Sequence, residues 1–170
     1  MNHKNNLEQL KLLLENRFKI HEIDHSTYGF QYLAGSIPFN CYAEINEIDM
    51  SFIFRAISTQ VIPEDKKNDF IIYSTMINYD IPIGFFSLNI ETGDYRWKSG
   101  VFFRNTVLTP EMMKDVLESS FYYLKYYVLS YVSLLNNQPL DIALSRVGED
   151  PGIGASDSCK PEKDHYFGDL

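Results

Sequence analysis

The sequence predicts an α+β fold in which an antiparallel sheet is packed by helices. Several stretches alternate apolar and polar residues with a period of two, the pattern of strands that bury one face. In other stretches apolar residues recur three or four positions apart, as in helices that bury one side. Read in order, these stretches give a helix, three strands, a second helix, two strands and a third helix, followed by a tail.

The first predicted helix covers residues 4–18, and three strands follow it. The stripe that this helix would bury consists of Leu7, Leu10, Leu14 and Phe18. A short strand lies around Ile20 and Ile23. Two longer strands with alternating apolar residues cover residues 39–45 and 50–56, so each is expected to turn one face to the core.

The second predicted helix begins at Pro63, because proline suits the first helical turn, and Pro82 ends it. Its apolar stripe consists of Phe70, Tyr73, Met76 and Ile77. A hairpin then joins a strand at residues 85–90 to a strand at residues 95–103. Gly93 lies in the connecting turn, where a residue with positive φ is expected.

The third predicted helix begins at Thr109, a good N-cap residue, with Pro110 in the first turn. Its apolar residues recur alternately four and three positions apart and are Leu117, Phe121, Leu124, Val128, Tyr131 and Leu135. Pro139 ends the helix, and residues 140–144 are expected to add one short turn.

The composition favours one domain followed by a tail. We predict a single domain at residues 1–147, because 170 residues with 45% apolar and 22% charged side chains can bury a sizeable core. From Gly148 onward glycine, proline, serine and acidic residues dominate. Residues 148–170 are therefore predicted to form an acidic, mobile tail.

The charge and the cysteine content argue for a cytoplasmic protein that does not bind nucleic acid or membranes. Acidic residues outnumber lysine and arginine by 23 to 15, whereas a phosphate backbone is bound mainly by basic side chains. No apolar run is long enough to span a bilayer, and the first residues lack a secretory pattern. Two cysteines are too few for a disulfide framework, which favours a reducing compartment.

This order of elements, with its landmarks, resembles the YbjN family of bacterial proteins, which are proposed to regulate sensory transduction. The resemblance extends over residues 7–136 and includes the last helix, and its matching segments are Met76-Ile77-Asn78, Gly84-Phe85-Phe86-Ser87-Leu88, Gly93-Asp94-Tyr95-Arg96-Trp97-Lys98 and Leu108-Thr109-Pro110-Glu111. It implies the fold of type III secretion chaperones, a homodimer, and binding of another polypeptide. It implies no catalytic residue and no cofactor.

The last helix is the candidate interaction surface. Tyrosines outside its apolar stripe widen the aromatic band beyond the roughly 100° that packing on one sheet requires. Tyrosine is also enriched at protein interfaces. A partner-binding or dimer surface is therefore predicted at Phe121, Tyr122, Leu124, Tyr126, Val128 and Tyr131. The alternative is that this helix only packs in the core.

Other motifs offer weaker candidates. His21-Glu22-Ile23-Asp24-His25 matches the H-E-x-x-H string of zinc hydrolases, but that string needs a helix to bring both histidines to one ion. In a strand, residues four apart lie about 13 Å from each other, and one zinc ion then cannot bind both.

Cys41 alternates with apolar residues and is expected to be buried. Gly152-Ile153-Gly154 lacks the lysine and the strand–loop–helix context of a phosphate loop.

The function predicted from the sequence is that of a non-enzymatic, chaperone-like or regulatory adaptor that binds another protein or peptide through apolar surfaces. A zinc-dependent hydrolase using His21, Glu22 and His25 is one alternative. A sensor that binds a small ligand between helix and sheet is another.

Overall fold

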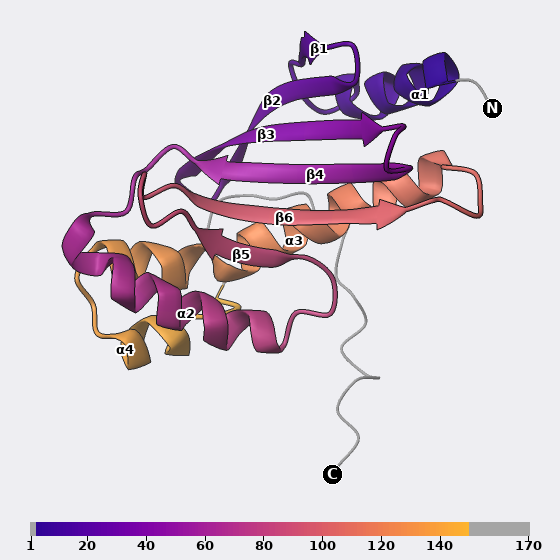
Figure 1. Ribbon diagram of the computed structural model, residues 1–170. Helices are drawn as coiled ribbons and strands as arrows, with labels where there is room; N and C mark the ends of the chain where they lie inside the picture. The colour runs from indigo at the N-terminus through magenta and orange to yellow at the C-terminus, as the bar shows by residue number, and fades with distance from the viewer. Residues whose placement is uncertain (1–2, 150–170) are drawn as a thin grey trace.

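The computed structural model describes residues 3–149, which form six strands, four α-helices and one 3₁₀ turn (Figure 1). In chain order these are α1 (His3–Glu15), β1 (His21–Asp24), β2 (Thr27–Ala34), β3 (Ile37–Asn46), β4 (Ser51–Ser58), η1 (Glu64–Lys66), α2 (Lys67–Tyr79), β5 (Phe85–Leu88), β6 (Tyr95–Phe102), α3 (Pro110–Leu135) and α4 (Leu140–Ser145). The predicted tail, except for its first two residues, lies outside the described part of the chain.

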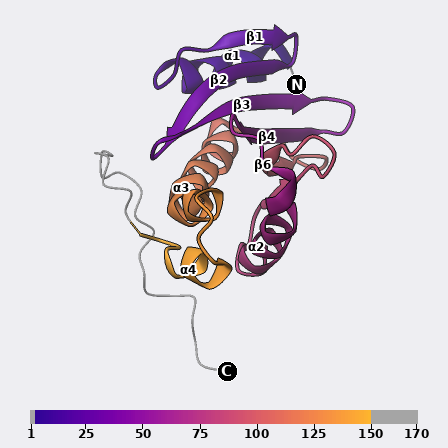
Figure 2. The same ribbon diagram turned by 90° about the vertical axis from the view of Figure 1, so that its left-hand side faces the viewer.

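The strands form one antiparallel sheet in the order β1-β2-β3-β4-β6-β5. Helices α2, α3 and α4 lie together on one side of this sheet (Figure 2). Helix α1 adjoins α3 near β2, and its Leu10 and Leu14 are buried there. The α+β prediction, with an antiparallel sheet packed by helices, is therefore confirmed.

The predicted element order is wrong in one respect: four strands, not three, precede the second helix. The additional strand is β2. Tyr28, Phe30 and Tyr32 pair with inward-facing residues of β3. The residues that alternate with them, Gly29, Gln31 and the exposed Leu33, face the other side of the sheet. An outward glycine and an outward leucine interrupt the polar half of the alternation, and for that reason the strand was not recognised in the sequence.

The first helix is shorter than predicted, because α1 ends at Glu15. The backbone N–H groups of Arg17 and Phe18 both donate to the carbonyl oxygen of Leu14, which closes the last turn. Phe18 lies outside the helix, and its ring stacks on Phe30 with 4.5 Å between ring centroids.

The core between sheet and helices is rich in aromatic side chains. The largest of those fully buried are Trp97, Tyr73, Tyr95, Phe30, Phe52, Phe54 and Phe70. Ring pairs connect the elements. Tyr131 of α3, for example, lies 5.2 Å from Tyr95 of β6 and 5.5 Å from Phe70 of α2, measured between centroids. Such aromatic pairs strengthen the packing of the helices on the sheet.

Helix α3 is capped at both ends. The residue that its sequence predicts caps the N-terminus, and a tertiary contact caps the C-terminus. The Thr109 side chain accepts a hydrogen bond from the Met112 N–H. At the other end the buried Lys66 ammonium donates to the carbonyl oxygens of Leu134 and Leu135. A cation at a helix C-terminus satisfies free carbonyl groups and opposes the negative end of the dipole.

Candidate interaction surfaces

The predicted surface on α3 divides into a buried part and a half-buried part. The side chains that pack inside the molecule are Phe121, Leu124, Val128 and Tyr131. Tyr122 and Tyr126 are half-buried and face away from the sheet. The regular stripe therefore packs in the core, and only the two tyrosines outside it are open to a partner. Their binding role stays a prediction.

Tyr122 and Tyr126 belong to an aromatic cluster on the outer side of α3. Their rings stack with centroids 5.4 Å apart, and the ring of Tyr126 meets that of Tyr127 edge-on at 5.0 Å. Burial, followed by the neighbouring Tyr126, raises the pKa of Tyr122. Gly148 donates its N–H to the Tyr126 carbonyl oxygen, so the end of the described chain returns to this helix.

A second surface, on α2, was not anticipated. Ile72, Met76 and Tyr79 are spaced four and three residues apart and lie on the side of the helix opposite its buried residues. Their exposed fractions are 49%, 49% and 90%. The prediction that Met76 belongs to the buried stripe is therefore wrong, whereas Phe70, Tyr73 and Ile77 are buried as expected.

This exposed face of α2 carries no charged residue between Ile71 and Tyr79. We call the set Ile71, Ile72, Met76 and Tyr79 the α2 stripe. Together these side chains expose on the order of 500 Å², near the upper end for the largest apolar patch of a monomeric protein. The signal was present in the sequence as the run Ile71-Ile72-Tyr73-Ser74-Thr75-Met76-Ile77-Asn78-Tyr79, which is too apolar for a helix with only one buried face.

The histidine string does not have the geometry of a zinc hydrolase. His21 and Glu22 lie in the exposed strand β1, and His25 lies in the turn that follows. The imidazole of His21 lies across Gly29 of the neighbouring strand. Within residues 3–149 no group of three or more histidine, cysteine, aspartate or glutamate side chains could hold a metal ion.

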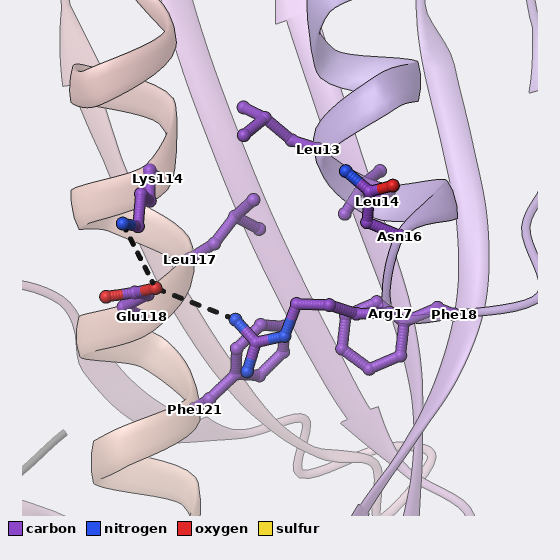
Figure 3. A pocket seen from close by; sticks show the side chains of 9 residues that line it. All are labelled: Leu13, Leu14, Asn16, Arg17, Phe18, Lys114, Leu117, Glu118 and Phe121. Atoms are coloured by element: carbon purple, nitrogen blue, oxygen red, sulfur yellow. Dashed lines mark ion pairs between the residues drawn. The ribbon is translucent and has the colours of Figure 1, made fainter. Parts of the chain in front are cut away.

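A shallow pocket opens between α1 and α3 (Figure 3). Leu13, Leu117 and Phe121 form its apolar wall, and Glu118 pairs with both Arg17 and Lys114 at its rim. Its volume is about 170 Å³, whereas ligand sites usually measure roughly 300–1,000 Å³. The rim charges bind one another, so the pocket offers little for a small ligand to recognise.

The buried hydroxyl groups are used within the core. Tyr73 bonds to Ser130, Ser58 to Tyr131 at 2.8 Å, and Ser99 to Ser120 at 2.7 Å. Cys41 is buried as predicted, and burial raises the pKa of its thiol well above the usual value. The Ser58–Tyr131 and Ser99–Ser120 pairs join α3 to the sheet, and the Tyr73–Ser130 pair joins α2 to α3. The Gly152-Ile153-Gly154 segment and Cys159 lie outside the described residues.

An open antiparallel sheet with helices on one side, and with exposed apolar side chains on α2, defines a small α+β module. The crystal structure of YbjN, a proposed transcription regulator from E. coli, is similar: the TM-score is 0.52 at 11% sequence identity, over 83% of this chain and 93% of that one. No protein-family model and no curated protein sequence matches the chain. The resemblance to YbjN seen in the sequence is thus confirmed as a shared fold.

Membrane insertion through a helix finds no support in the described residues. None of the helices between His3 and Ser145 combines the length and the hydropathy that crossing a bilayer requires.

Proposed function

We propose that this protein is a non-enzymatic adaptor that binds other polypeptides through apolar surface, in the manner of a chaperone or a regulatory module. The observation that carries the proposal is the α2 stripe. A protein with a net charge of −8 presents four exposed apolar side chains on α2, with no charged residue between Ile71 and Tyr79. Burying large apolar side chains there releases free energy in proportion to the area covered.

The arrangement of polar groups supports a role without catalysis. The hydroxyl pairs described above are buried beneath the sheet, where substrate has no access. The histidines of the string lie apart from any third ligand in residues 3–149. The fold shared with YbjN agrees with a regulatory role, because that protein is itself proposed to regulate transcription.

The partner that we assign first to the α2 stripe is a second copy of this chain. Two identical stripes can pair about a two-fold axis, so that the α2 stripe of one copy contacts the α2 stripe of the other. A standard interface buries about 800 Å² on each partner, so the stripe would form its apolar centre and polar neighbours its rim. Tyr122 and Tyr126, on α3, would then remain free in the dimer for a further polypeptide.

Photo-crosslinking from α2 tests the proposal. A benzophenone side chain placed at Tyr79 is expected to give a defined adduct, to a second copy or to one partner polypeptide, because this side chain is the most exposed of the stripe. The same probe at the exposed Glu91, in the hairpin turn, is the control. The adduct should disappear in the Ile72→Lys variant, which places a charge on the stripe without touching the core.

Two results would contradict the proposed function. One is a Tyr79 probe that gives no adduct beyond that of the Glu91 control. The other is an adduct that persists unchanged in the Ile72→Lys variant, while sedimentation shows that the protein is a monomer with and without this substitution.

A further inference from the structure

The face of the sheet opposite the helices is a second candidate surface, and its residues follow from the strand register. Tyr42 of β3, Arg55 of β4, Lys98 of β6 and Phe85 of β5 are direct neighbours in one row across the sheet. Their inward-facing neighbours in sequence are buried, so this row points away from α2 and α3. We call the outward side of β3, β4, β6 and β5 the open face (Figure 1).

The open face carries a charge opposite to that of the whole protein. Its basic side chains are Arg55, Lys98 and Arg96, and its acidic side chain is Glu44. Glu44 is already paired with Arg55. Arg96 donates only to the neutral Ser87 hydroxyl, at 3.1 Å. Two cationic groups, Arg96 and Lys98, therefore lie here without a carboxylate partner in residues 3–149.

Apolar and aromatic groups surround these cations. Ile53 and Ile57 of β4 face outward on either side of Arg55, and Phe85 is exposed beside Lys98. An extended peptide on such a surface gains both charge pairing and apolar contact, whereas a phosphate backbone would meet the repulsion of a protein with net charge −8.

We propose that residues 150–170 of the same molecule dock on the open face. This segment of 21 residues contains five acidic and two basic side chains, and Tyr166 and Phe167 add aromatic surface near its end. Its charge thus complements the open face, and its aromatic residues match the apolar surround.

The segment is long enough to reach the open face. It leaves the described chain beyond Glu149, where the backbone N–H of the adjacent Gly148 donates to the Tyr126 carbonyl oxygen in the middle of α3. An extended chain of this length spans about 70 Å, whereas a domain of this size has a radius of gyration of about 15 Å. A tethered segment also acts at an effective concentration in the millimolar range, so a weak contact suffices to hold it.

A nitroxide label at Cys159 tests this contact in the full chain. Cys159 lies within the segment, and the other cysteine, Cys41, is buried with a raised thiol pKa and should not react. The label is expected to broaden the amide signals of Tyr42, Arg55 and Lys98 until most of their NMR intensity is lost. Signals of the α2 stripe should keep their intensity.

Charge variants establish what holds the segment. The pair Arg96→Glu and Lys98→Glu should restore the open-face signals, and so should molar salt, which shortens the screening length to about 3 Å. The control pair Lys11→Glu and Lys114→Glu makes the same change in net charge on the exposed helical side and should leave the broadening intact. Neutralising Asp157, Glu162 and Asp164 to their amides should act like the open-face pair.

Three outcomes would overturn the proposal. The first is intact signals across the open face in the labelled protein. The second is broadening that occurs only when labelled and isotope-enriched molecules are mixed, which would assign the segment to another copy. The third is broadening that persists both in molar salt and in the protein that carries Arg96→Glu and Lys98→Glu, which would show that charge does not hold the segment on this face. None of these outcomes depends on the α2 stripe, so the proposed function stands or falls separately.

Discussion

Gly93 shows how much one position contributes to this fold. Its φ of +77° lies in the left-handed region, and a Cβ atom there would come within 2.6 Å of the Ile62 carbonyl oxygen. The Ile62 N–H also donates to the Gly93 carbonyl oxygen at 2.9 Å. The hairpin turn between β5 and β6 is thus held against the segment that leads into α2.

Replacing Gly93 with alanine should lower the free energy of unfolding by roughly 1–3 kcal/mol, because alanine is strained at positive φ and its methyl group collides with fixed backbone. Urea denaturation measures the change. Glu91→Ala, an exposed substitution in the same turn, is the control and should stay within about 0.5 kcal/mol of the parent. Equal stability of the two variants would show that the turn can move away from Ile62.

At the scale of the residue, the sequence predicted the positive φ of Gly93 but not the contact of Gly93 with Ile62. A glycine between Thr92 and Asp94 in a hairpin turn indicates positive φ. That the same glycine lies against Ile62, some thirty residues earlier, depends on how α2 closes over β5. The burial of Cys41 was predictable because it required only the local alternation of β3.

At the scale of the elements, two lysines connect the start of α2 to distant parts of the chain. Lys66 binds the last carbonyl groups of α3, and Lys67 donates to the Ile90 carbonyl oxygen in the hairpin and to Glu64. Both side chains are buried over most of their length. Their alkyl stems pack in the core while the ammonium groups satisfy backbone carbonyls.

We expect Lys66→Met to lower the free energy of unfolding by about 1–3 kcal/mol, because it keeps the apolar stem and leaves the carbonyl groups of Leu134 and Leu135 without their donor. Thermal or urea unfolding measures the loss, and hydrogen exchange should show faster opening at the end of α3. Lys19→Met, at an exposed lysine, serves as the control. A stability unchanged from the parent would mean that water replaces the ammonium group.

The α2 stripe shows why periodicity alone misplaced a residue. Met76 follows Tyr73 at helical spacing, so the pattern assigned it to the buried side. The helix has apolar residues on both sides, and a periodic pattern cannot tell which side meets the sheet. The Asn78 side-chain amide donates to the Phe86 carbonyl oxygen and accepts from the Phe86 N–H, at 2.8 Å each, and this contact fixes the rotation of α2 that turns Met76 outward.

At the scale of the whole molecule, buried tyrosines cause the free energy of unfolding to fall at alkaline pH. Burial raises the pKa of Tyr131 to about 12, and it raises the pKa values of Tyr73, Tyr95 and Tyr127 as well. The folded protein therefore favours the neutral phenols. Their contribution to stability is complete below pH 10, the pKa of tyrosine in the unfolded chain, and is lost as the pH rises through the folded-state values.

Stability should accordingly fall steeply between pH 10 and about pH 12. Tyr131 alone accounts for roughly 2–3 kcal/mol of this loss, from two units of pKa at 1.36 kcal/mol each. Denaturation at pH 9 and at pH 11.5 measures the fall, and ultraviolet titration should show the buried phenols ionising only on unfolding. In Tyr131→Phe the slope should be shallower. Titration of every tyrosine near pH 10 in the folded state would contradict the expectation.

The sequence by itself determined the class of fold and most of the strands and helices, because these depend on local periodicity and on capping residues, but it left open whether the stripe of α3 packs in the core or meets a partner. Only the tertiary structure decided that β2 is a strand, that α2 exposes an apolar face, and that Arg55 of β4 lies beside Lys98 of β6 on the outward side of the sheet. Those features depend on register and helix rotation, which are set by contacts between residues distant in the chain. A contact between side chains on two different strands produces no periodic pattern within either segment of the sequence.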